Sequence, residues 1–131
     1  LVALMRHYGY TQENFTLSPK IKKDLLSINK VIDYIDEHLC EDIRLENLAA
    51  ITYMNSSYFS TIFKKYNGIS PSEYIAKKRI YRAKEYLKAS DKTVLEIAGL
   101  CGFNNPTNFY KTFKKVTGKI PSDFRQTSSN S

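Results

Sequence analysis

Two copies of one sequence pattern follow each other in this chain, and this duplication constrains its fold more than any other feature. Residues 49–74 resemble residues 98–124, at a constant offset of 50 from Phe59 onward and at an offset of 49 upstream of it. The matched positions include Phe59/Phe109, Phe63/Phe113, Lys64/Lys114, Lys65/Lys115, Gly68/Gly118, Pro71/Pro121, Ser72/Ser122 and Tyr74/Phe124. Two copies are too few for a solenoid, which usually needs at least three. The duplication therefore predicts two related, separately packed units.

Each copy has the pattern of a helix, a tight turn and a second helix. In the second helix of each copy, two phenylalanines four residues apart form one apolar stripe, which predicts a buried face. Residues suited to helix ends stand at the expected places: Asn55, Thr93 with Glu96 as a capping box, and Asn104 or Asn105 at the starts, with Gly68 and Gly118 at the ends. One departure is visible, because Arg44 stands where the first copy would need an N-cap.

The remaining segments also have helical spacing. Ser70 and Pro71 favour the start of a long helix that runs to about Lys88, and apolar residues from Ile28 to Leu39 predict an upstream helix that completes the core of the first unit. The fold class is therefore all-α, with two helix-turn-helix units joined by a long linker helix and about seven helices. The expected divisions are 1–25 (end of an upstream domain plus a linker), 26–70 (first unit), 71–89 (connecting helix), 90–127 (second unit) and 128–131 (disordered tail).

The charge is unevenly distributed along the chain. Residues 1–50 carry 6 basic and 8 acidic residues, whereas residues 51–131 carry 14 basic and 5 acidic ones. This asymmetry favours a polyanionic partner, of which a nucleic-acid backbone is the simplest, although a merely solubilising face would have the same composition. The charge alone leaves these two alternatives open.

The sequence gives no support for an enzyme. His7 and His38 are solitary, Cys40 and Cys101 have no partner at metal-ligand spacing, and no glycine-rich phosphate loop is present. We expect no cofactor and no metal site, and we interpret both cysteines as buried thiols of a reducing cytoplasm. No apolar run approaches the roughly 18 residues of a membrane span.

Tandem helix-turn-helix units predict a way of binding duplex DNA. The second helix of such a unit enters the major groove, and two of them are ordinarily spaced about 34–36 Å apart by a dimer. Here one chain holds both, and a spacer of about 18 residues would span roughly 27 Å. A monomer could then cover two successive groove segments, and because the copies differ, its site should be asymmetric.

Taken together, these motifs resemble one known family. The segments SYFSTIFKKYNGISPSEYI (57–75), RAKEYL (82–87), TVLEIAGLCGF (93–103) and FYKTFKKVTGKIPSDFR (109–125) are similar to those of AraC/XylS transcriptional regulators, over about residues 26–125. The resemblance implies a sequence-specific regulator of transcription, most simply an activator, that binds double-stranded DNA and can touch RNA polymerase. It also implies that a small-molecule effector acts only through a preceding sensor domain, of which residues 1–15 would be the last helix.

The resemblance implies roles for particular residues as well. Base-reading positions of the family are occupied here by Ser57, Ser60, Thr61, Pro106, Thr107, Asn108 and Lys111. Positions that contact the DNA backbone are occupied by Lys64, Tyr110 and Lys114, with Lys65 and Lys115 as additions. Lys111 can donate to guanine and Asn108 can pair with adenine, whereas the small Ser57 and Thr61 and the non-donating Pro106 predict weaker direct reading.

Two competing interpretations accompany this hypothesis. Lys64, Lys65, Lys114 and Lys115 could be ordinary solvated surface. For Tyr58 and Tyr81 we expect packing in the protein more than contact with phosphate. The whole domain could instead be a helical protein-interaction module that binds a partner without reading DNA. Salt dependence separates these functions, because phosphate neutralisation makes log K fall linearly with log salt.

Overall fold

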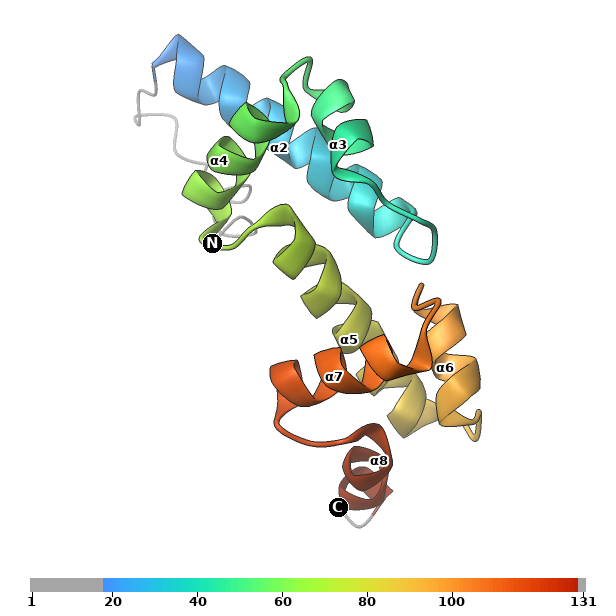
Figure 1. Ribbon diagram of the computed structural model, residues 1–131. Helices are drawn as coiled ribbons and strands as arrows, with labels where there is room; N and C mark the ends of the chain where they lie inside the picture. Colours follow the sequence, from blue (N-terminus) through green and yellow to red (C-terminus); the bar gives the residue numbers. More distant parts are fainter. Residues whose placement is uncertain (1–17, 130–131) are drawn as a thin grey trace. The chain divides into compact units, whose positions relative to one another are not determined.

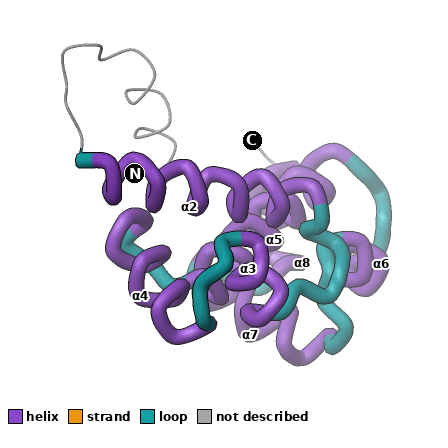
Figure 2. Tube along the Cα trace, turned by 90° about the horizontal axis from the view of Figure 1, so that it is seen from above, coloured by secondary structure: helices purple, strands orange, loops and turns teal. Residues whose placement is uncertain are grey.

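The computed structural model describes residues 18–129, and this part of the chain consists of helices and the loops between them (Figures 1 and 2). The seven helices are α2 (Pro19–Glu37), α3 (Leu45–Ile51), α4 (Ser56–Asn67), α5 (Pro71–Ala89), α6 (Val94–Leu100), α7 (Pro106–Thr117) and α8 (Pro121–Ser129). No strand occurs in residues 18–129, which confirms the predicted all-α class. The short helix expected at the start of the chain lies outside the described residues.

Two ends of the predicted segments are wrong. Residues 19–25, expected in a linker, form the first turns of α2, because the Ser18 Oγ accepts the Ile21 N–H at 3.2 Å and Pro19 suits a first helical turn. Residues 128 and 129, expected in a disordered tail, belong to α8. Each residue added to an existing helix gains one backbone hydrogen bond, so a helix can continue through weak helix formers.

The backbone divides into two compact units, and the division falls within α5, after Tyr74. The first unit contains residues 18–37 and 43–74. Its core combines the apolar faces of three helices: Ile28, Val31, Ile32 and Ile35 of α2, Leu48 and Ala49 of α3, and Phe59, Ile62 and Phe63 of α4. The Phe63 ring meets Tyr74 edge to face at 5.6 Å between centroids, which ties α4 to the first turn of α5.

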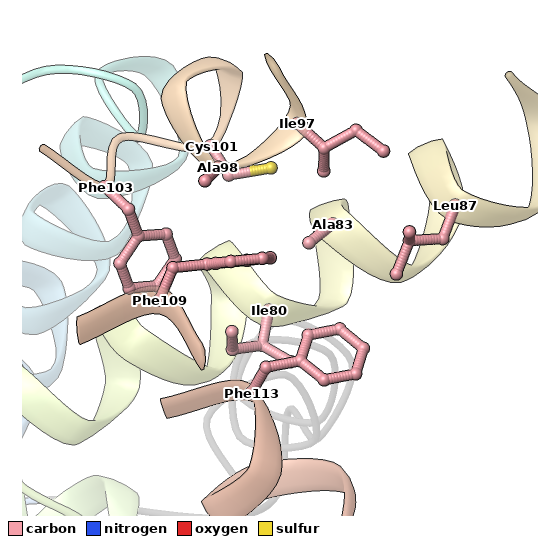
Figure 3. Packing of buried hydrophobic residues seen from close by; sticks show 9 residues of the cluster. All are labelled: Ile80, Ala83, Leu87, Ile97, Ala98, Cys101, Phe103, Phe109 and Phe113. Carbon is pink, nitrogen blue, oxygen red and sulfur yellow. The ribbon is translucent and has the colours of Figure 1, made fainter. Parts of the chain in front are cut away.

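The second unit repeats this arrangement. Figure 3 shows Phe109 and Phe113 of α7 packed with Ile80 and Ala83 of α5, and Ile97 of α6 belongs to the same buried cluster. Its remaining members are Leu87, Ala98, Cys101 and Phe103, with Tyr86, Val94 and Phe124 packed against them. The Phe113 ring meets Phe124 at 5.7 Å, at the same place in the repeat as the contact between Phe63 and Tyr74. The predicted aromatic stripes are therefore buried in both copies.

A short segment between α2 and α3 packs with the second unit, not with the first. Residues His38–Asp42 cluster there, and Arg79 of α5 fixes the segment through its Nε, which donates to the Leu39 carbonyl at 3.0 Å, and its Nη2, which donates to the Glu41 carbonyl at 2.7 Å. We expected Leu39 to extend the helix that completes the first unit, but that helix ends at Glu37 and the Leu39 backbone groups with the second unit. The Leu39 side chain is buried.

The helix ends follow the sequence closely. Asn55 and Asn105 cap α4 and α7, and Thr93 and Glu96 form the predicted capping box of α6. Gly68 and Gly118 end α4 and α7 in the left-handed conformation, and Arg44 at the start of α3 makes no side-chain capping bond, as expected.

Gly102, in the turn between α6 and α7, has a φ of +93°, and a Cβ there would lie 2.7 Å from the Leu39 carbonyl oxygen and 2.9 Å from the Arg79 Nε. We therefore expect Gly102→Ala to lower the free energy of unfolding by about 2–4 kcal/mol, because strain and collision add. Two controls separate these causes. Gly118→Ala, with a φ of +81° and open space, should cost only about 1–2 kcal/mol, whereas Gly99→Ala in α6 should stabilise by up to about 1 kcal/mol. Urea unfolding curves measure all three, and an equal cost for Gly102→Ala and Gly118→Ala would contradict the collision.

Candidate nucleic-acid interface

Helix α4 has one buried face and an opposite face open to solvent. Its start is fixed by Asn55, whose Oδ1 accepts the Tyr58 N–H at 2.8 Å. Phe59 and Phe63 are fully buried, so the direction of the core-facing side is set by two residues one turn apart. Residues at i, i+4 and i+7 on the far side of the helix are Ser57, Thr61 and Lys64, all exposed.

Helix α7 presents the same arrangement at an offset of 50. The Asn105 Oδ1 accepts the N–H groups of Thr107 at 2.8 Å and Asn108 at 3.4 Å, and Pro106 occupies the first helical position. Phe109 and Phe113 are buried. The residues on the opposite side of the helix are Thr107, Lys111 and Lys114, again all exposed.

The structure brings the residues implied by the resemblance onto these two helices. Those on α4 are Ser57, Ser60, Thr61, Lys64 and Lys65, and those on α7 are Pro106, Thr107, Asn108, Tyr110, Lys111, Lys114 and Lys115. All are exposed except Ser60, which is half-buried because it lies at the edge of the core-facing side. Eight side chains of the set lie within the first two turns of their helix.

Two members of this set have side-chain contacts that limit what they can offer a partner. The Thr61 hydroxyl donates to the Ser57 carbonyl at 3.1 Å, so it faces a partner mainly as an acceptor. The Lys65 ammonium lies 5.6 Å from the centre of the Tyr66 ring. Because a cation over an aromatic ring is already stabilised, Lys65 has a structural role that Lys64 lacks among the contacts described.

The lysines also suit their helices electrostatically. Lys64 and Lys65 lie in the last turn of α4, and Lys114 and Lys115 lie in the last turn of α7. A cation there interacts favourably with the helix dipole by about 0.3–1 kcal/mol. Their placement therefore has a stabilising effect of its own.

Exposed tyrosines are the residues that the sequence interpretation misplaced. We expected Tyr58 and Tyr81 to pack, but they are 40% and 62% exposed, and Tyr53 is 98% exposed. Tyr58 directly follows Ser57 in α4, at a position where its ring does not reach the core. Tyr53 lies in the turn before α4, where the spacing of a helical stripe no longer applies and periodicity gives no signal.

The described residues include no cluster of three or more histidine, cysteine, aspartate or glutamate side chains suited to a metal ion, and residues 18–129 contain no helix that is both long and apolar enough to cross a bilayer. Burial raises the pKa of the Cys101 thiol to about 11. Cys40, expected to be buried, is exposed, because its segment lies at the surface of the second unit, where the Sγ donates to the Leu100 carbonyl at 2.7 Å.

Two copies of a helix, a turn and a capped second helix with an exposed polar and basic side define the class of this protein as a tandem helix-turn-helix domain. Residues 48–127 match the family model described as "Helix-turn-helix domain". The regulatory protein PocR of Salmonella typhimurium strain LT2 is 37% identical over 99 residues, covering 76% of this chain and 33% of PocR. The bifunctional transcriptional activator/DNA repair enzyme AdaA of Bacillus subtilis strain 168 is 38% identical over 101 residues, covering 77% of this chain and 48% of AdaA.

Solved structures show the same similarity. The DNA-binding domain of the transcriptional factor AdpA, in complex with a target DNA, superposes with a TM-score of 0.76 at 31% identity, over 79% of this chain and 94% of that one. The C-terminal domain of AraT, a response regulator from Geobacillus stearothermophilus, gives a TM-score of 0.74 at 29% identity, over 86% and 88% of the two chains. The chain belongs to the AraC-type helix-turn-helix family of transcriptional regulators, as its motifs predicted.

The two thiols should differ sharply in reactivity. At pH 7.5 a thiol with a pKa of about 11 is less than about one part in a thousand thiolate, and Cys101 is also buried, so iodoacetamide should modify Cys40 and leave Cys101 unmodified. Peptide mapping by mass spectrometry should find one adduct per folded chain and two per chain in denaturant. A Cys40→Ser variant should take up none when folded. Equal modification of both cysteines in the folded chain would contradict the described packing.

Proposed function

We propose that this domain binds double-stranded DNA sequence-specifically by placing α4 and α7 in separate segments of the major groove. The observation that carries the proposal is the duplicated exposed side: Ser57, Thr61 and Lys64 on α4 have the same register as Thr107, Lys111 and Lys114 on α7. A helix about 10–12 Å in diameter fits a major groove about 12 Å wide. The structural neighbour AdpA, whose DNA-binding domain was solved with a target DNA, supports DNA as the partner.

The residues near the start of each helix are proposed to read bases. Lys111 can donate to the O6 and N7 of guanine, and Asn108 can pair with the N6 and N7 of adenine. Thr107 and the half-buried Ser60 offer hydroxyl groups, and Pro106 can make only an apolar contact, such as one with a thymine methyl group. On α4 the base-reading residues Ser57 and Thr61 are short, which favours contacts through water.

Phosphate contacts are proposed for the basic and phenolic side chains further along the helices. These are Lys64 and Lys65 on α4 and Tyr110, Lys114 and Lys115 on α7. They belong to the part of the chain, residues 51–131, that carries 14 basic and 5 acidic residues. Contacts of this kind position a protein on the duplex without specifying sequence.

The site should not be palindromic. Equivalent positions of α4 and α7 carry different side chains. At the offset of 50, Thr61 corresponds to Lys111 and Ser60 corresponds to Tyr110. Each helix would therefore prefer a different base sequence. One chain would bind two unlike half-sites in a fixed order.

We further propose that the domain is the output part of a longer cytoplasmic regulator, most simply an activator that also contacts RNA polymerase, and that it catalyses no reaction itself. The chain spans about a third to a half of the length of the curated relatives PocR and AdaA, and AdaA is named as a transcriptional activator. The signal for this chain would reach it through a preceding domain. A small-molecule effector fits such a domain, and a response-regulator input, as in the name of AraT, is the alternative.

Substitution of single lysines tests the assignment of roles. Lys111→Ala should weaken binding by roughly 1–3 kcal/mol and relax the preference at one base pair, because it removes a base contact. Lys64→Ala should weaken binding to all sequences about equally and reduce the salt slope by about 1, because it removes a phosphate contact. Selection of bound sequences from random duplex DNA, followed by titrations at several salt concentrations, measures both effects.

The parent chain provides the control for this experiment. Its log K should fall linearly with log salt, with a slope of about −0.9 per neutralised phosphate. A domain that acted only as a protein-interaction module would select no common sequence. Recovery of the same preferred site with Lys111→Ala as with the parent would contradict the assignment of Lys111 to base reading.

A further inference from the structure

The turns that precede α4 and α7 have the same backbone but opposite surroundings. In the second turn, the Gly102 N–H donates to the Gly99 carbonyl at 3.1 Å and the Phe103 N–H to the Ala98 carbonyl at 2.9 Å. In the first turn, the Tyr53 N–H donates to the Ala50 carbonyl and the Met54 N–H to the Ala49 carbonyl, each at 3.2 Å. These pairs correspond at an offset of 49, so Tyr53 occupies the place of Gly102.

Tyr53 holds a backbone conformation that favours glycine. Its φ is +58°, and it is the one residue other than glycine with a positive φ in the part of the chain that the structure describes. A side chain at such a φ crowds the following carbonyl, so a bulky residue there is an outlier. The substitution of tyrosine for glycine therefore costs the folded domain free energy.

Burial of the Tyr53 side chain does not offset this cost in free energy. The Tyr53 side chain is 98% exposed, more than any other large hydrophobic residue in residues 18–129, so its ring buries no surface. The matching position in the second unit is enclosed, because a Cβ on Gly102 would collide with the Leu39 carbonyl and the Arg79 guanidinium. At this position only the first turn is open to a partner, and there an aromatic residue stands where the second turn has glycine.

The position of Tyr53 indicates what that partner is. It lies two residues before Asn55, the N-cap of α4, and four residues before Ser57. The proposed function brings the start of α4 to the major groove, whose edges are lined by phosphates. A tyrosine hydroxyl is among the groups that donate to phosphate oxygens in protein–DNA complexes.

We infer that Tyr53 is a DNA-contacting residue, whose hydroxyl donates to a backbone phosphate beside the groove segment that α4 enters. This inference rests on the proposed function and adds a residue to it. Strain that is retained without benefit to the fold is typical of functional sites. Because the tyrosine hydroxyl carries no charge, it releases no counterion from the DNA. This contact should therefore raise DNA affinity without changing the salt dependence of binding.

Two variants of the 131-residue chain test the contact, with the duplex selected by the parent chain as the probe. Tyr53→Gly relieves the strain and removes the ring, so its thermal midpoint should rise by about 2–5 °C while its DNA affinity falls about tenfold. Tyr53→Phe keeps the ring and the strain, so its midpoint should stay unchanged while its affinity falls about fivefold. Neither variant should change the salt slope, whereas the control Lys64→Ala should reduce it by about 1.

The outcomes separate this inference from the proposed function. A higher thermal midpoint with a lower DNA affinity in Tyr53→Gly, together with a lower affinity in Tyr53→Phe, would support the contact. Parental affinity in both variants would overturn the inference, while DNA binding by the domain would stand. Failure of the parent chain itself to select any duplex sequence would overturn the proposed function and this inference together.

Discussion

The packing of two phenylalanines one turn apart is the interaction on which the structure depends. In α4 these are Phe59 and Phe63, at 5.8 Å between ring centroids, and in α7 they are Phe109 and Phe113, also at 5.8 Å. A pair of buried rings on one side fixes the rotation of a helix about its axis, and truncating such a ring to alanine typically costs about 3–5 kcal/mol. The side away from the rings is then held open to solvent, and it carries the short polar and basic residues.

The two units share this packing but differ around it. Segment His38–Asp42, which follows α2 in the chain, is fixed to the second unit by Arg79, and its backbone closes over the turn at Gly102. The corresponding turn of the first unit is open at Tyr53. The two copies of the helix-turn-helix unit therefore differ, because one has an enclosed turn and the other an exposed turn. Sequence divergence on the helix surfaces alone would not produce this difference.

The features that the sequence predicted correctly are those that repeat between the two copies or depend on residues close together in the chain. The aromatic stripes, the caps at Asn55 and Asn105 and the capping box at Thr93 depend on spacing within a few residues, and all are present. The grouping of the Leu39 backbone with the second unit depends on Arg79, 40 residues away, whose side chain donates to the Leu39 carbonyl, and no residue pattern encodes such a contact.

The candidate site was predictable to the same extent. Its residues could be placed on α4 and α7 because the buried stripe determines the opposite side, but the exposure of Tyr58 could not be predicted, since Tyr58 has no periodic partner. The alignment of Tyr53 with Gly102 held a usable signal, because a bulky residue in a glycine position marks strain. Only the contacts around Gly102 showed that the two turns differ in exposure.

Protection of guanine N7 from dimethyl sulfate tests most directly whether both exposed helices enter the major groove. With the selected duplex and the 131-residue chain, the account predicts two protected patches about 10–10.5 base pairs apart on one side of the helix, with unlike sequences. Lys111→Ala should reduce protection at one guanine of one patch and leave the other patch unchanged. A single protected patch in the parent complex, or no protection of guanine N7 at all, would contradict the account.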